Sequence, residues 1–134
     1  MIEHKHIIIR AEVTKPPQDI RKVKKWLRKL VKAIGMRPLG KPTAVYVNKI
    51  DNKGITAVQC IETSHIALHC WDETSPAVLQ LDVYTCSNLD KEIVLLFLDD
   101  FEPMVKGAER VGIHAIHVTD HAEAITQVQE LLKS

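Results

Sequence analysis

The sequence predicts an α+β domain, in which an antiparallel sheet is covered on one face by helices. In several segments apolar residues alternate with period two, as they do in strands with one buried face. In three longer segments they recur every three or four positions, which is the period of an amphipathic helix. The length of 134 residues suits one hydrophobic core, so we expect a single domain over residues 1–134.

The chain begins with a strand and a helix. The stretch "KHIIIRAEV", residues 5–13, has strand character, and "KPP" then interrupts it because proline fixes φ. A helix follows from Gln18 and ends at Gly35. Its apolar stripe comprises Ile20, Val23, Leu27, Leu30, Val31 and Ile34. Its outer face is basic and carries Arg21, Lys22, Lys24, Lys25, Arg28, Lys29 and Lys32.

The middle of the chain predicts further strands. Residues 43–50 and 55–61 form a hairpin around a "DNKG" turn that contains Gly54. Residues 65–71 and 77–86 then alternate with period two, so each has an aliphatic side and a reactive side. The reactive sides carry His65, His69 and Trp71 in the first strand and Gln80, Asp82, Tyr84 and Cys86 in the second. Residues 90–101 have helical character, 112–118 form a short strand, and 121–134 form a closing helix.

Composition excludes several classes of protein. No apolar run approaches the roughly 18 residues that a membrane-spanning helix needs, and the N-terminus lacks the apolar stretch of a secretory signal. Three cysteines, Cys60, Cys70 and Cys86, show no CxxC spacing and leave one thiol unpaired in any disulfide scheme. We therefore expect reduced thiols, a cytoplasmic protein and no metal site.

Charge is distributed unevenly along the chain. Residues 1–50 carry 13 Lys/Arg against 3 Asp/Glu, whereas residues 51–134 carry 5 against 14. Oppositely charged halves attract each other within one chain or between two chains, which favours a compact or self-associating protein over a nucleic-acid binder. We expect a homodimer. The only aromatic residue among the helix charges is Trp26, which is too little for base stacking. The basic helix face is then either a solvated surface or a surface for an acidic partner.

The stretch "SHIALHCWDE", residues 64–73, followed by "LDVYTC", residues 81–86, resembles the self-processing S-adenosylmethionine decarboxylases of the short prokaryotic type. Members carry a Ser-His, a further histidine, a Trp-x-Glu and a "DV(F/Y)TC" strand in this order. The resemblance extends from about residue 4 to "FEP" at residue 103 and leaves an atypical tail at 104–134. It implies the α/β sandwich of that family.

The resemblance also implies a proenzyme that cleaves itself between Thr63 and Ser64. Ser64 would become a pyruvoyl group, whose ketone condenses with the α-amine of S-adenosylmethionine and accepts the electrons released with CO₂. The reaction would serve polyamine (spermidine) synthesis. Thr56 and His69 would assist processing, and Cys86 would donate a proton in catalysis. The substrate would be bound by Trp71, Glu73 and His65.

Two departures leave a second function open. Thr63 stands where the family usually has glutamate, and seventeen positions separate His69 from Cys86, about two more than the family pattern. Both features also suit an unprocessed, non-catalytic homologue that binds a nucleoside or acts as a structural or regulatory module in an oligomer. Cys60 and Cys70 fit structural roles, and an isolated Cys86 would be a small buried apolar residue.

Residues 93–134 weakly resemble the C-terminal end of haloacid dehalogenase-like hydrolases. In that family, paired acids after a hydrophobic strand bind Mg²⁺, and Asp99 and Asp100 would be those acids. The nucleophile motif of the family, two aspartates one residue apart, is missing upstream, so phosphoryl transfer has no nucleophile here. This resemblance therefore predicts a structural tail only.

Overall fold

The computed structural model describes residues 4–99 and 114–117. The elements in chain order are β1 (Lys5–Val13), α1 (Ile20–Ala33), β2 (Thr43–Val47), β3 (Gly54–Ile61), β4 (Ser64–Trp71), β5 (Ala77–Thr85), α2 (Lys91–Asp99) and β6 (His114–His117). Every element predicted within these residues is present, and the differences are confined to the ends. The helix expected over residues 121–134 lies outside the described residues.

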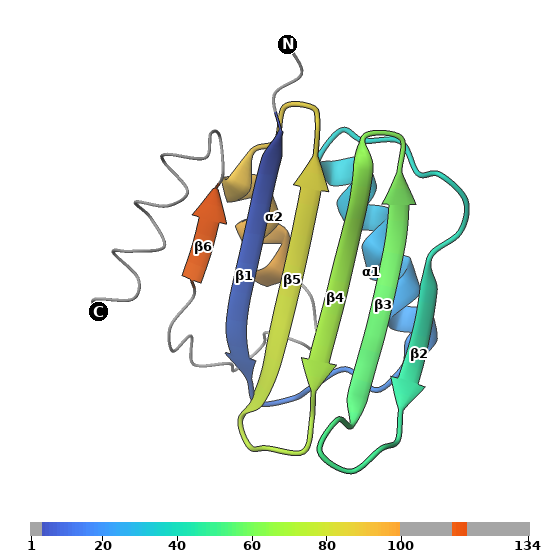
Figure 1. Cartoon of the computed structure of the whole chain (residues 1–134), viewed down its shortest axis with the longest axis vertical. Coiled ribbons are helices and arrows are strands. Elements are labelled where there is room, and N and C mark those ends of the chain that lie inside the picture. The colour runs from blue at the N-terminus through green and yellow to red at the C-terminus, as the bar shows by residue number, and fades with distance from the viewer. Residues whose placement is uncertain (1–3, 100–113, 118–134) are drawn as a thin grey trace.

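The strands form one antiparallel sheet. Its order is β2-β3-β4-β5-β1-β6, so β2 to β5 run as a meander, and β1 lies between β5 and β6. Both helices lie on the same face of the sheet, behind it in Figure 1. The predicted fold class, an antiparallel sheet covered on one face by helices, is confirmed.

The core lies between the sheet and the two helices. Helix α1 contributes Val23, Leu27 and Leu30, all of which are fully buried. Trp26 is buried as well and packs against Phe97 of α2, with 5.7 Å between the ring centroids. This tryptophan therefore belongs to the core and offers no ring for base stacking. The basic residues predicted for the outer side of α1 are exposed, apart from the half-buried Lys24.

The other face of the sheet carries no helix among the described residues, and we call it the open face. Along β4 and β5, fully buried aliphatic residues alternate with half-buried residues that point to the open face. The predicted separation of an aliphatic side from a reactive side is therefore correct for both strands. No helix among the described residues is long and apolar enough to cross a membrane.

Gly54 lies at the start of β3 instead of in the preceding turn, where the sequence had placed it. Its φ of +142° is disfavoured for residues with a side chain. A Cβ atom at this position would lie 1.7 Å from the carbonyl oxygen of Cys70 in β4. Glycine thus permits the close approach of β3 and β4, which carry Thr56 and His69 on neighbouring positions.

Candidate active site

The Thr63–Ser64 peptide lies in the tight turn between β3 and β4. Glu62 and Thr63 form this turn, and Ser64 pairs with Ile61 on one side and with Thr85 on the other. The φ of Ser64 is +143°, a region populated almost only by glycine. Such a conformation costs about 1–3 kcal/mol in a residue with a side chain, and strain of this kind is concentrated at functional sites.

The carbonyl oxygen of Thr63 accepts a hydrogen bond from the backbone N–H of Cys86, with 3.0 Å between the two atoms. Cys86 directly follows β5 and is exposed. A fixed N–H donor at a carbonyl stabilises negative charge that develops on its oxygen when a nucleophile adds. The pairing of β4 with β5 therefore places a polarising donor at the Thr63 carbonyl, and this donor belongs to a residue whose thiol is free and exposed.

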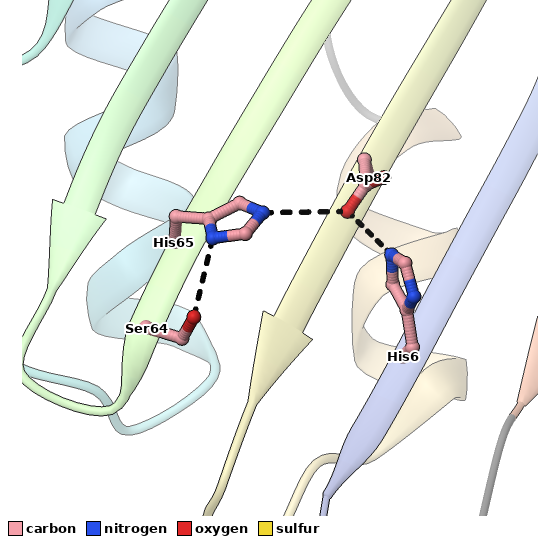
Figure 2. A network of polar contacts seen from close by, with 4 residues as sticks. All are labelled: His6, Ser64, His65 and Asp82. Atoms are coloured by element: carbon pink, nitrogen blue, oxygen red, sulfur yellow. Dashed lines mark hydrogen bonds and ion pairs between the residues drawn. The ribbon is translucent and has the colours of Figure 1, made fainter.

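The Ser64 hydroxyl belongs to a chain of polar contacts that crosses three strands (Figure 2). Its Oγ lies 3.2 Å from Nδ1 of His65. Nε2 of His65 lies 3.8 Å from Oδ1 of Asp82, and Nε2 of His6 lies 2.7 Å from the same oxygen. Sequence reasoning missed His6 as a site residue. Its period-two position in the first strand is a signal only once β1 is known to pair with β5.

The aromatic ring of Tyr84 lies between the two imidazoles. It stacks on His65 at a centroid distance of 5.7 Å and meets His6 edge-on at 5.2 Å. Its hydroxyl also hydrogen-bonds Nδ1 of His4 at 2.8 Å. The contacts with both imidazoles and at the hydroxyl restrict the orientation of the Tyr84 ring. We refer to Ser64, His65, Asp82, His6, Tyr84 and Cys86 as the serine end of the open face.

A second cluster lies at the other end of β4. Oγ1 of Thr56 and Nδ1 of His69 are 3.3 Å apart, and the His69 ring stacks on Trp71 with centroids 5.6 Å apart. The indole N–H of Trp71 donates to Oδ1 of Asn52 at 2.9 Å. The Glu73 carboxylate accepts the backbone N–H groups of Asp51 and Lys53 at 3.1 and 3.4 Å. We refer to Thr56, His69, Trp71 and Glu73 as the tryptophan end.

A cavity of about 660 Å³ opens beside the tryptophan end. Its lining residues are Arg10, Asp51, Trp71, Glu73, Thr74, Val78 and Gln80. The volume lies in the range of sites for small molecules, roughly 300–1,000 Å³. An aromatic face beside charges of both signs suits a ligand that has a flat base and charged groups. Arg10 was not identified from the sequence, because β1 contains no motif that distinguishes it.

The two ends are far apart within one chain. Ser64 and His69 are five residues apart on β4, which corresponds to about 16 Å at the strand rise of roughly 3.3 Å per residue, and Trp71 lies about 23 Å from Ser64. The structure therefore brings Ser64, His65 and Cys86 together. It also brings Thr56, His69, Trp71 and Glu73 together, but it does not join these two groups in one chain.

The three cysteines are all free thiols in different surroundings. Burial raises the pKa of Cys70 to about 12, and the nearby negative charge of Asp72 adds to this shift. Cys70 points to the core side of β4 and is 2% exposed, which agrees with the structural role expected of it. Cys60 and Cys86 are exposed. Within residues 4–99 and 114–117, no group of three His, Cys, Asp or Glu side chains is arranged to hold a metal ion.

The fold and the site define an α+β protein with a strained serine and a ligand-sized cavity on one open sheet face. Comparison with known proteins identifies the class more narrowly, because the family model for S-adenosylmethionine decarboxylase matches residues 5–106. A similar protein is the S-adenosylmethionine decarboxylase proenzyme of Archaeoglobus fulgidus. It is 29% identical over 106 residues, which cover 77% of this chain and 90% of that protein. The chain belongs to the S-adenosylmethionine decarboxylase family, as its motifs predicted.

The weak resemblance to haloacid dehalogenase-like hydrolases finds no support in the structure. It required paired acids after a strand, whereas Asp99 is the last residue of helix α2. Asp100 lies outside the described residues. The match to the decarboxylase family extends to residue 106 and so includes both aspartates.

Proposed function

We propose that this protein is a pyruvoyl-dependent S-adenosylmethionine decarboxylase, a carboxy-lyase, whose proenzyme cleaves itself between Thr63 and Ser64 and which serves polyamine (spermidine) synthesis. Membership of the family supports the activity, and the relative from Archaeoglobus fulgidus is itself named a proenzyme. The observation that carries the cleavage site is the strained φ of Ser64, whose hydroxyl adjoins a carbonyl that already accepts the Cys86 N–H.

The serine end fits a pyruvoyl group made from Ser64. The group would begin the C-terminal fragment at the start of β4, near Cys86, whose backbone N–H bonds the Thr63 carbonyl and whose thiol is exposed. When present, it supplies a ketone that accepts the electron pair released with CO₂. Cys86 would hold the proton that replaces CO₂ on the product. A Cys86→Ala variant, which retains the backbone N–H, should therefore lose decarboxylation far more than cleavage.

The tryptophan end fits the nucleoside of S-adenosylmethionine. The indole of Trp71 offers a stacking face, and its own N–H is already bonded to Asn52. Glu73 is held by two backbone N–H groups, so its carboxylate is fixed at the cavity wall. Thr56 and His69 lie behind this ring and would assist processing, while His65, at the opposite end, would contact the reacting part of the substrate.

A homodimer reconciles the two ends. No single chain can place one substrate at both Ser64 and Trp71, because about 23 Å of strand separates them. Two copies related by a twofold axis perpendicular to the strands, with their open faces together, would set the serine end of one chain against the tryptophan end of the other. The open face carries apolar side chains that such packing would bury, including Val45 and Val58, which are 53% and 38% exposed.

A cytoplasmic location is part of the proposal. The free state of all three cysteines supports a reducing compartment, since disulfides form mainly in oxidising ones. Neither nucleic acid nor a membrane is proposed as a partner. The exposed basic residues of α1 lack an exposed aromatic side chain among them, and they form a solvated surface.

Intact mass and denaturing gels test the cleavage directly. Processing at Ser64 predicts two fragments of 63 and 71 residues, and the protein should release CO₂ from carboxyl-labelled S-adenosylmethionine. Ser64→Ala is the matched control and should remain a single chain without activity. A wild-type chain that stays intact and releases no CO₂ would contradict the proposal. Ligand-dependent melting would then test the alternative, a nucleoside-binding homologue without catalysis.

Co-production of two inactive variants tests the shared site. Ser64→Ala and His69→Ala damage opposite ends, so a mixed dimer would contain one intact site formed by the undamaged end of each chain. We expect cleavage of the His69→Ala chain only when the Ser64→Ala chain is present. Absence of complementation between two folded, associated variants would contradict a site built from both chains.

A further inference from the structure

We infer that His65 is the base that activates Ser64 for self-cleavage. Asp82, which is held by His6, orients the His65 ring and favours the positive charge that this ring acquires when it takes the proton. This inference rests on the proposed self-cleavage and adds a role that substrate binding by His65 does not include. The observation that supports this inference is the line of contacts from Ser64 through His65 to Asp82 and His6 (Figure 2).

The two nitrogens of His65 have different neighbours. Nδ1 lies 3.2 Å from the Ser64 hydroxyl, and Nε2 lies 3.8 Å from the Asp82 carboxylate. A neutral imidazole carries its proton on one nitrogen and accepts on the other. The negative charge of Asp82 favours the proton on Nε2, which leaves Nδ1 as the acceptor facing the hydroxyl. The resting arrangement is therefore that of a base.

Asp82 is itself held in place. Nε2 of His6 donates to its Oδ1 at 2.7 Å, a short hydrogen bond. The Tyr84 ring lies between the two imidazoles and stacks on His65, which holds the plane of the His65 ring. The Asp82 side chain is 22% exposed and that of His65 is 45% exposed. Water therefore screens their attraction in one protomer, and the arrangement serves orientation more than stability.

The step balances without any other reactant. His65 Nδ1 takes the proton of the Ser64 hydroxyl while Oγ forms a bond to the carbonyl carbon of Thr63. Negative charge then develops on the Thr63 oxygen, which already accepts the Cys86 N–H at 3.0 Å. The C–N bond between Thr63 and Ser64 breaks, and the released nitrogen takes the proton back from His65. The product is an ester with a free amine on Ser64.

Within one chain no other histidine or thiol among the described residues is placed for this role. His69 is about 16 Å from Ser64 along β4. His6 is engaged by Asp82 on the far side of the Tyr84 ring. Cys86 reaches Thr63 through its backbone N–H, and among the described residues the side chain seen in contact with the Ser64 hydroxyl is His65, not the Cys86 thiol.

Cell-free synthesis of the full chain, followed by a chase on denaturing gels, measures the cleavage rate. General base catalysis typically contributes about 10²–10⁴-fold, so His65→Ala should cleave at least 100 times more slowly. Added imidazole should restore part of this rate, because it replaces the missing base. Glu12→Gln is the matched control for Asp82→Asn. It removes a carboxylate from the same open face, at a position where β1 pairs with Val78, and should leave cleavage unchanged.

A double variant separates positioning from a general structural role. If Asp82 acts through His65, then Asp82→Asn slows cleavage in the wild-type background but adds little in His65→Ala. If Asp82 only supports the fold, the two losses multiply. Cleavage of His65→Ala at the wild-type rate overturns the inference, as does a folded His65→Ala that imidazole fails to rescue.

Subunit mixing distinguishes the inference from the proposed function. His65 and Ser64 lie at the same end, so co-production of Ser64→Ala with His65→Ala should give no complementation, whereas Ser64→Ala with His69→Ala should. Complementation in both pairs would mean that the essential His65 acts on Ser64 of the other chain. That result would overturn the inference but leave the proposed decarboxylase function intact. A wild-type chain that never cleaves would overturn both, because no step would remain for His65.

Discussion

The serine end and the tryptophan end of the open face differ in what each one lacks. The serine end has a strained residue, a base and a polarised carbonyl, but the cavity lies elsewhere. The tryptophan end has the cavity, a stacked pair of rings and a fixed carboxylate, but no activated nucleophile. In the proposed function, the serine end breaks a bond and the tryptophan end holds the ligand.

This division teaches that β4 alone cannot be the active site, although it carries most of the motif. A strand of eight residues places its first and last side chains too far apart for one substrate. In the proposed homodimer, the serine end of one chain would lie against the tryptophan end of the other, so that each site would be formed by both chains.

The largest expected difference is in thiol reactivity. Because the pKa of Cys70 is raised to about 12, its thiolate fraction at pH 8 should be about 10³ times lower than that of an ordinary thiol. Iodoacetamide should therefore modify Cys86 and Cys60 and leave Cys70 untouched until the protein unfolds in urea. Peptide mass mapping measures this. Modification of folded Cys70 as fast as Cys86 would contradict its burial on the core side of β4.

Loss of the Trp71 ring should affect substrate more than cleavage. Stacking of a base on an aromatic side chain contributes about 1–3 kcal/mol, so Trp71→Leu should raise KM for S-adenosylmethionine by roughly 10- to 100-fold. Ile93→Ala, an exposed change on helix α2, is the control. If Trp71→Leu cleaves slowly but binds substrate normally, the Trp71 ring acts in processing, and the two ends do not differ in function as proposed.

Much of this site was predictable because strand periodicity is a local property. Alternation alone placed His65, His69 and Trp71 on one side of β4 and Cys70 on the other, as the structure has them. The same alternation placed Asp82 and Tyr84 on the reactive side of β5. Local pattern could not reveal His6, because its contact with Asp82 joins residues 76 positions apart.

The conformation of Ser64 was also hidden from the sequence. A φ of +143° is usually indicated by glycine, and serine gives no such signal. The separation of the two ends needed the register as well. Once β4 is known to run straight from Ser64 to Trp71, the distance between these two residues follows from the strand rise. In the sequence motif alone they stand close together, and their separation in space is not evident.

Backbone strain at Ser64 should be measurable as a difference in the free energy of unfolding between two variants. Ser64→Ala and Ser64→Gly both remove the nucleophile, so both stay intact and can be compared as folded proenzymes. Glycine accepts the φ of +143° that alanine resists, and we expect Ser64→Gly to be more stable by about 1 kcal/mol after its larger loss of chain entropy. Urea midpoints at equal slope measure the difference. An Ala variant as stable as the Gly variant would show that Ser64 is not strained.

The smallest expected effect concerns salt, and it tests how the two ends are brought together. The basic residues of α1 lie on the helix-covered side, whereas the proposed contact uses the open face and its exposed Val45 and Val58. At 1 M salt the Debye length falls to about 3 Å, which weakens attraction between the basic and acidic halves but not apolar burial. We therefore expect a dimer that forms faster at low salt and persists at 1 M salt.

Sedimentation at both salt concentrations measures whether the dimer persists. A monomer under both conditions would reject the dimer, and complete dissociation at 1 M salt would mean that charge, and not the open faces, holds the two chains together.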